Sequence, residues 1–127
     1  MKTFSISWKS SKKPRKQRKY VYNAPKHLQV KFRSAPLSTD LLKKFGVKNI
    51  PVRKGDKVRV LRGQFKGKTG EVLGFHKIKN KVYVQGCELI KKDGTKTTYP
   101  LHASTLQIIE LKTEDKKRKL KPLEKKK

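Results

Sequence analysis

Cysteine is almost absent from this chain, because Cys87 is the only one among 127 residues. A single cysteine cannot form a disulfide within the chain, and it cannot supply the paired ligands of a Cys-x-x-Cys metal site. We therefore expect a reducing, intracellular compartment. Long apolar runs are also lacking. None approaches the length of a bilayer, so we expect no membrane span.

Acidic residues are scarce, with 9 Asp and Glu against 36 Lys and Arg. They are scattered, whereas a nuclease needs clustered carboxylates for metal ions or a histidine pair for acid–base work. The histidines lie far apart, at His27, His76 and His102, and do not form a zinc-ligand pattern. The sequence therefore predicts no enzyme, no catalytic residues, no metal or other cofactor and no small-molecule substrate.

Positive charge is what the chain has in excess, because its formal net charge is +27 at pH 7. A compact domain with this charge repels itself unless a polyanion offsets the repulsion. Binding to a phosphate backbone releases counterions, which supplies tight, salt-sensitive affinity without a pocket. We therefore expect RNA or DNA as the partner, and a merely soluble lysine-rich protein is the alternative. The 33% of hydrophobic residues can fill only a small core, which favours one domain.

Both ends of the chain are basic and poor in apolar residues. Residues 9–19 read KSSKKPRKQRK, and no acidic residue occurs before Asp40. From residue 112 onward the chain again carries runs of lysine and arginine, such as KKRKLK. Segments of this composition cannot build a core of their own, so we expect both to be disordered until a partner neutralises them.

Two short helices are predicted between these ends. Asn23 is a candidate cap for a basic helix that runs to Arg33. Ser38 is a candidate cap for a second helix at about Thr39 to Phe45, and Gly46 is typical of a helix end.

After Pro51, apolar and polar residues alternate with the two-residue period of β-strands. The strand signals are residues 57–60, 71–75, 81–84 and 106–111. Asp93-Gly94 predicts a type I′ hairpin turn. Five or six short strands favour a mainly β fold, a small SH3-like antiparallel barrel that closes its own edges. One or two short N-terminal helices and extended basic termini complete the expected architecture.

The segment from Gly63 to Thr69 ends in Gly-Lys-Thr, as a phosphate-binding P-loop does. A P-loop has four residues between its glycines and opens a helix, whereas three residues separate Gly63 from Gly67 and a strand pattern follows. The better interpretation is a strand, a glycine-bearing turn and a strand. Residues 55–75 in this arrangement resemble the KOW motif of ribosomal and transcription-elongation proteins.

The flanks of this motif carry a closer resemblance. Upstream, the chain reads KKPRKQRKYVYNAP and then RSAPLSTDLLKKFGVKNIPVRKGDKV; downstream, it reads YPLHASTLQIIEL and then EDKKRK. These segments resemble the archaeal and eukaryotic form of the ribosomal protein L24 family, called L26 in eukaryotes, from Lys12 to Lys119. The chain departs from that pattern at Lys26, at Gln29 and in residues 1–11.

The resemblance implies a structural constituent of the large ribosomal subunit, located in the cytoplasm with the ribosome. It implies binding to large-subunit rRNA beside neighbouring ribosomal proteins, near the exit of the nascent-chain tunnel, and a role early in subunit assembly. The alternative is a KOW-type transcription elongation or RNA-binding factor.

We divide the chain into a basic N-terminal arm (1–22), a short helical segment (23–50), a KOW/SH3-like barrel (51–111) and a basic C-terminal tail (112–127). Gly67 can adopt a positive φ and leaves room for a phosphate. Tyr20 and Tyr22 are candidates for stacking on unpaired bases, with packing against the barrel as the alternative. The predicted RNA-binding residues are Lys12, Lys13, Arg15, Lys16, Arg18, Lys19, Tyr20, Arg33, Arg53, Lys54, Arg59, Arg62, Lys66, Gly67 and Lys68.

Overall fold

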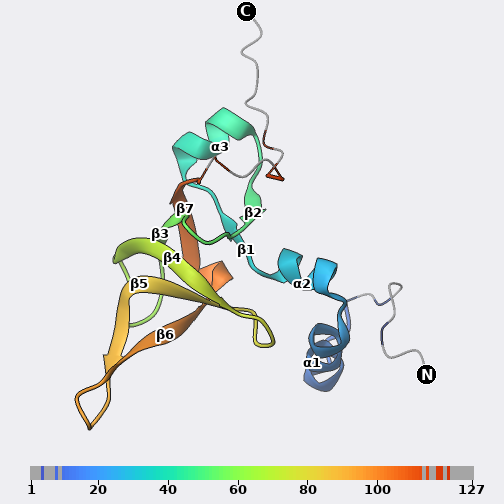
Figure 1. The fold of residues 1–127 in the computed structure, drawn as a ribbon. Coiled ribbons are helices and arrows are strands. Elements are labelled where there is room, and N and C mark those ends of the chain that lie inside the picture. The colour runs from blue at the N-terminus through green and yellow to red at the C-terminus, as the bar shows by residue number, and fades with distance from the viewer. Residues whose placement is uncertain are drawn as a thin grey trace, which may run out of the picture.

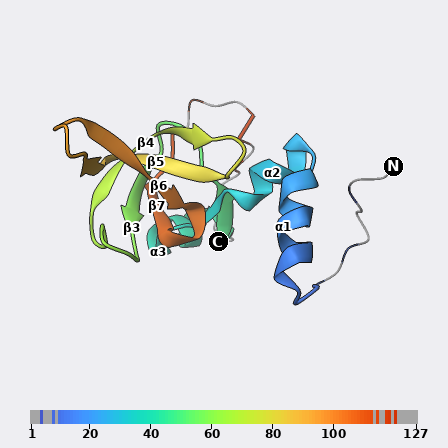
Figure 2. The same ribbon diagram turned by 90° about the horizontal axis from the view of Figure 1, so that it is seen from below.

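The computed structural model describes residues 4, 8, 10–112, 114, 117, 118 and 120. Within these residues the chain forms three α-helices, seven β-strands and one 3₁₀ turn. The strands gather into a small curled body, and the first two helices lie to one side of it in both views (Figure 1; Figure 2). Most of the predicted C-terminal tail and of the leader 1–11 lies outside the described residues.

A five-stranded sheet forms the main body, with every neighbouring pair antiparallel and the order β6-β5-β4-β3-β7. Its strands are β3 (Lys57–Val60), β4 (Thr69–His76), β5 (Lys81–Ile90), β6 (Lys96–His102) and β7 (Leu106–Glu110). The register shifts between Val72 and Gly74 and again between Tyr83 and Glu88. Such irregularities bend a strand and increase its twist, which curls the sheet. The predicted mainly β, barrel-like fold is confirmed.

The expectation that the barrel closes its own edges is wrong for the described residues. β6 and β7 lie at the two ends of the strand order and do not pair with each other. The 3₁₀ turn η1 (Ala103–Thr105) connects them and changes the chain direction before a ladder can form. A backbone hydrogen bond, from the Leu61 N–H to the Thr105 carbonyl oxygen at 2.8 Å, joins the end of β3 to this turn.

A second, two-stranded sheet covers one end of the body. β1 (Ser34–Pro36) pairs antiparallel with β2 (Asn49–Pro51), and helix α3 (Thr39–Phe45) lies between them in the sequence. The helix has the predicted bounds. It ends as expected at Gly46, which has a φ of 66° and donates its N–H to the Leu42 carbonyl oxygen. Ser38 occupies the N-cap position, but its side chain makes no capping hydrogen bond.

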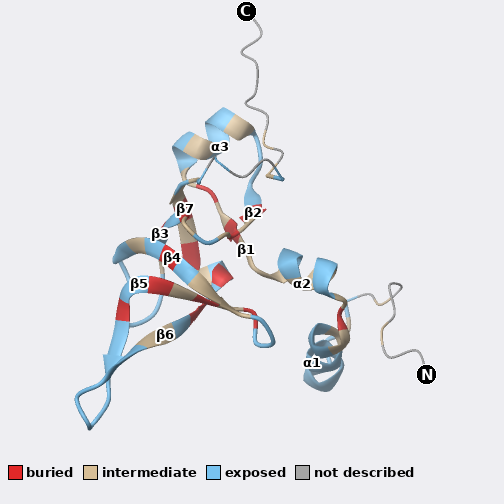
Figure 3. Ribbon diagram, viewed as in Figure 1, coloured by how far each residue is buried: buried red, intermediate tan, exposed pale blue. Residues whose placement is uncertain are grey.

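The core lies between the curled sheet and the two-stranded sheet, as the buried segments show (Figure 3). Its largest aliphatic side chains are at most 1% exposed. These are Val58, Val60, Val72, Val82, Val84, Leu106 and Ile108. Each fully buried side chain of this size contributes about 1.5 to 3 kcal/mol relative to an exposed one. Ala35, Leu37 and Ile50, from the helical segment of the sequence, pack into the same core.

The basic arm contains a helix that the sequence did not predict. α1 runs from Pro14 to Asn23, so the expectation of disorder is wrong for this part of the arm. Proline suits the first turn because its fixed φ is already helical. Aromatic contacts from Tyr20 to Phe4 and Trp8 then supply packing that composition alone does not reveal.

The break between the first two helices falls at Ala24, and the N-cap of α2 (Lys26–Phe32) lies two residues after the predicted cap, Asn23. Asn23 is the last residue of α1 rather than the cap of α2. A residue before proline avoids helical angles, and Ala24 accordingly has an extended ψ of 135°. Pro25 takes the N-cap position of α2.

The hairpin between β5 and β6 does not have the predicted type I′ turn. That turn needs a positive φ at two successive residues. Here Gly94 has a φ of 85°, whereas Asp93 is not among the described residues with positive φ. The Asp93 carboxylate accepts hydrogen bonds from the N–H and hydroxyl of Thr95, a local arrangement that fixes the turn. The Gly94 N–H donates to the Lys91 carbonyl oxygen, so one left-handed residue ends a three-residue loop.

Candidate nucleic-acid interface

The turn between β3 and β4, residues 61–68, is here called the KOW turn. Gly67 has the predicted positive φ, at 86°, and donates its N–H to the Val60 carbonyl oxygen at 2.8 Å. A Cβ placed there would meet no atom within 4 Å, so glycine is required by the backbone angle and not by crowding. Thr69 begins a strand rather than a helix, which confirms that the segment is not a P-loop.

One buried aromatic residue holds the KOW turn against the body. Phe65 is 7% exposed, and its ring centroid lies 5.4 Å from that of Tyr99. The Lys66 N–H donates to the Gly63 carbonyl oxygen and the Lys68 N–H to that of Phe65. These bonds give the turn a fixed shape, so its exposed surface is preorganised for a ligand.

Two cations of the KOW turn are held by carbonyl groups of the protein. Lys68 Nζ lies 3.3 Å from the Gly86 carbonyl oxygen and 5.1 Å from the centroid of the Phe65 ring. Arg62 Nη2 donates to the Ser104 carbonyl oxygen at 3.3 Å. These partners are neutral, and neither cation forms an ion pair with a carboxylate among the described residues. Lys66 is exposed between them.

The basic surface continues onto the outer face of β3. Arg59 is exposed, and the residues that pair with it are Thr69 on β4 and Gln107 on β7, both uncharged. Lys57, two residues earlier, pairs with Glu71 and Glu110, and its Nζ lies 3.2 Å from the Glu110 carboxylate. Positive charge is therefore neutralised at Lys57 and left free for a phosphate at Arg59.

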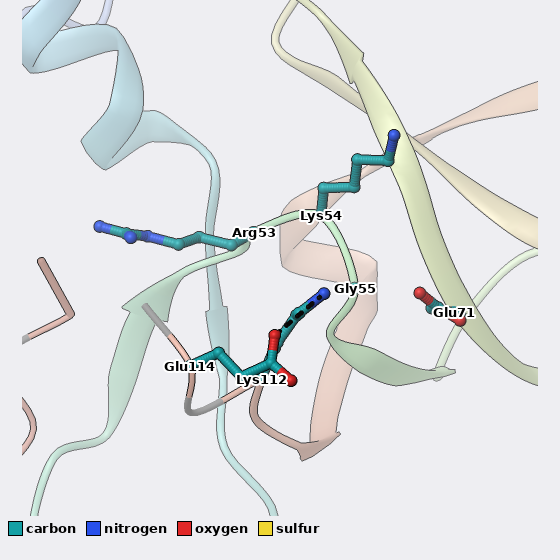
Figure 4. A pocket seen from close by; sticks show the side chains of 6 residues that line it. All are labelled: Arg53, Lys54, Gly55, Glu71, Lys112 and Glu114. Carbon is teal, nitrogen blue, oxygen red and sulfur yellow. Dashed lines mark ion pairs between the residues drawn. The ribbon is translucent and has the colours of Figure 1, made fainter. Parts of the chain in front are cut away.

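Arg53 and Lys54 lie at a different place, beside an open cleft of about 490 Å³ at the entry to β3 (Figure 4). The other residues that line it are Gly55, Glu71, Lys112 and Glu114. Lys112 Nζ lies 3.6 Å from Glu114, and the Glu71 carboxylate faces the same cleft. The mixed charges make this cleft a weaker phosphate site than the KOW turn.

The N-terminal cations are brought together by α1. Lys12 and Lys13 precede the helix, and Arg15, Lys16, Arg18 and Lys19 lie on it, all exposed. The helix buries no residue and has no acidic residue in its first turn. Arg33, at the end of α2, instead lies over the Phe75 ring, with its Cζ 4.8 Å from the centroid. The predicted residues thus form two exposed basic areas, α1 and the KOW turn with Arg59.

The sequence predicted no role for Asp56. The side chain is fully buried and accepts hydrogen bonds from the backbone N–H groups of Arg53 and Lys112. Arg118 adds two contacts to the same carboxylate and donates to the Pro51 carbonyl oxygen. Arg118 was expected to be ordered only by a partner, and that expectation is wrong, because a buried carboxylate binds it.

His102 has a structural role at the start of η1. Its Nδ1 accepts a hydrogen bond from the Ser104 N–H at 3.2 Å and lies 2.8 Å from the Ser104 hydroxyl oxygen. Burial, together with the nearby charges of Lys81 and Arg62, lowers the pKa of His102 below its ordinary range. The imidazole is therefore neutral at pH 7.

The described part of the chain holds no group of three or more metal-ligating side chains. It also holds no helix that is long and apolar enough to span a membrane.

Comparison with known proteins agrees with the family resemblance that the KOW turn and its flanks carry. A sequence model of the family that comprises ribosomal proteins L26 of eukaryotes and L24 of archaea matches residues 11–126. The chain belongs to this family. It is also 46% identical over 109 residues to the large ribosomal subunit protein uL24 of Korarchaeum cryptofilum, which covers 86% of this chain and 83% of that protein. As a member of the L24/L26 family, the chain is a structural ribosomal protein rather than an enzyme.

Proposed function

We propose that this chain is a constituent of the large ribosomal subunit that binds large-subunit rRNA through two basic areas, α1 and the KOW turn with Arg59. The observation that carries the proposal is the placement of uncompensated charge. Arg59, Lys66 and the cations of α1 are exposed, whereas the exposed cation Lys57 already faces Glu110 at 3.2 Å. A phosphate backbone supplies the negative charge that these two areas lack.

The two areas suit different parts of a folded RNA. The KOW turn is fixed by its own hydrogen bonds. A Cβ built at Gly63 or Gly67 would meet no atom within 4 Å, so a phosphate can approach the backbone closely there. α1 lies to one side of the strands, beyond α2, so it can reach a neighbouring RNA segment (Figure 2). Large RNAs are recognised through shape and backbone contacts of this kind.

We further propose that the protein acts early in assembly of the large subunit and lies near the exit of the nascent-chain tunnel, among neighbouring ribosomal proteins. This part of the proposal is supported by membership of the L24/L26 family. Membership of this family also implies a cytoplasmic location with the ribosome.

Sedimentation tests the main proposal. In a sucrose gradient at moderate salt, the tagged chain should travel with large subunits and should dissociate as the salt concentration rises. Movement with RNA polymerase instead would indicate a KOW-type elongation factor and would contradict the proposal. Depletion of the protein should also reduce the large-subunit peak, and a normal subunit profile without it would contradict the assembly role.

A further inference from the structure

The two tyrosines of α1 lie in opposite environments. They are two residues apart, which places them about 200° apart around a helix and therefore on opposite sides. Tyr20 is partly buried, whereas Tyr22 is 76% exposed. Both were candidates for base stacking from the sequence, and only Tyr20 was among the predicted RNA-binding residues, but the structure separates the two.

Tyr20 is the centre of an aromatic cluster. Its ring stacks on Trp8 with a centroid distance of 4.5 Å and an interplanar angle of 23°. Phe4 lies 5.0 Å away and Phe32 of α2 lies 5.9 Å away. The ring thus joins α1 to α2 and to residues that precede the helix. A base that stacked on Tyr20 would have to displace Trp8.

Tyr22 lies on the most basic side of the same helix. Arg18 and Lys19 precede it by four and three positions, so their side chains are its neighbours on the helix surface. Arg15 lies two turns before it on the same side. Within the part of the chain that the structure describes, the Tyr22 ring makes no contact with another ring. With 76% of its surface exposed, Tyr22 is accessible to a ligand.

The charge on this helix identifies the ligand as a polyanion. Like charges at spacings of three and four residues, such as Arg15 with Arg18 and Lys19, repel one another and destabilise an isolated helix. No carboxylate precedes Asp40 in the sequence, and the helix has neither an acidic first turn nor a side-chain cap. Phosphate groups beside Arg15, Arg18 and Lys19 would remove this repulsion and would hold a nucleotide next to Tyr22.

We propose that Tyr22, and not Tyr20, is the aromatic residue of the N-terminal arm that stacks on an unpaired rRNA base, while Arg15, Arg18 and Lys19 bind the adjoining phosphates. Tyr20 positions the helix by packing against Trp8 and Phe32. This inference rests on the proposed function, because it names the contact through which α1 binds the same RNA. A flat ring between cations suits single-stranded nucleotides, whose bases stack on aromatic side chains.

Filter binding of the full-length chain to purified large-subunit rRNA, with excess duplex RNA as competitor, tests the proposal. Tyr22→Ala should weaken binding by about five-fold or more, in line with the loss of one stacked base. Tyr22→Phe should bind as the wild type does, because the ring remains. Tyr22→Leu should lose as much as Tyr22→Ala, because bulk without a ring cannot stack. Val21→Ala is the matched control on another side of the helix and should bind normally.

The salt dependence separates stacking from charge. Tyr22→Ala should leave the slope of log affinity against log salt unchanged, because a lost stacking contact releases no counterions. Arg18→Gln should make the slope shallower. Equal binding by Tyr22→Ala and wild type, or an equal loss in Tyr22→Phe, would overturn this inference alone. Absence of salt-sensitive rRNA binding by the wild type would instead overturn the proposed function.

Discussion

The guanidinium of Arg118 binds the carboxylate of Asp56 through two short contacts, 2.6 Å from Nη1 to Oδ1 and 2.8 Å from Nη2 to Oδ2. Both side chains are buried, with 6% of Arg118 and none of Asp56 exposed. The residues are 62 positions apart, so the pair fixes part of the basic C-terminal segment against the entry to β3. This arginine therefore stabilises the protein itself, whereas most other cations in the described part of the chain are exposed.

Asp56→Asn should destabilise the fold strongly. The change leaves the buried Arg118 charge without a counter-charge, and breaking one partner of a buried pair costs about 3 to 5 kcal/mol. Urea unfolding followed by circular dichroism measures the difference. Glu110→Gln is the matched control, because it breaks the exposed pair with Lys57 and should change the free energy of unfolding by less than about 1 kcal/mol. Similar losses of free energy of unfolding in the two variants would show that the buried pair stabilises the fold no more than the exposed pair does.

Gly67→Ala should destabilise the KOW turn because of its backbone angle. A residue with a Cβ costs about 1 to 2 kcal/mol in the left-handed conformation, and Gly67 has a φ of 86°. Gly74→Ala is the control, because a Cβ there also meets no atom within 4 Å but the backbone has no positive φ. The midpoint of thermal unfolding should fall for Gly67→Ala and stay near the wild-type value for Gly74→Ala. A fall of the same size in both would assign the effect to loss of glycine in general.

The elements that the sequence predicted correctly are those with local signals. Ser38 and Gly46 bracket α3, and alternating valines such as Val58 and Val60 mark the core strands. Helix α1 was missed because its stabilising contact, from Tyr20 to Trp8, joins residues that no local pattern in the sequence links. Local composition there shows only charge, which is typical of disorder.

The candidate site was predictable as a set of residues but not as a surface. Sequence position could not show that Arg59 lies between uncharged neighbours while Lys57 lies between carboxylates, because strand register decides this. Nor could it show that Asp56 meets Arg118, since no pattern links positions 62 apart. The RNA contacts of the predicted residues stay predictions.

Arg59→Gln should lower the salt dependence of rRNA binding, whereas Lys57→Gln should change it little. Each phosphate neutralised contributes about 0.7 to 0.9 to the slope of log affinity against log salt. Arg59 is free to make such a contact, but Lys57 is already paired with Glu110. Filter binding across a series of salt concentrations measures both slopes. A shallower slope for Lys57→Gln than for Arg59→Gln would contradict the assignment of this phosphate contact to Arg59.

The stability of the fold should fall as the pH falls below about 6.5, because of His102. Burial, Lys81 and Arg62 lower the pKa of this group in the folded chain below its ordinary value of about 6.5. Below that value the unfolded chain binds a proton that the folded chain does not, so stability present above it is lost as the pH approaches the folded pKa. Urea midpoints at about pH 7.5 and about pH 5 measure the loss.

His102→Asn, which keeps an acceptor for the Ser104 N–H, should lose less stability between these pH values than the wild type. His27→Gln, a change on the exposed side of α2, should keep the full dependence, and an equal response in both variants would contradict the assignment to His102.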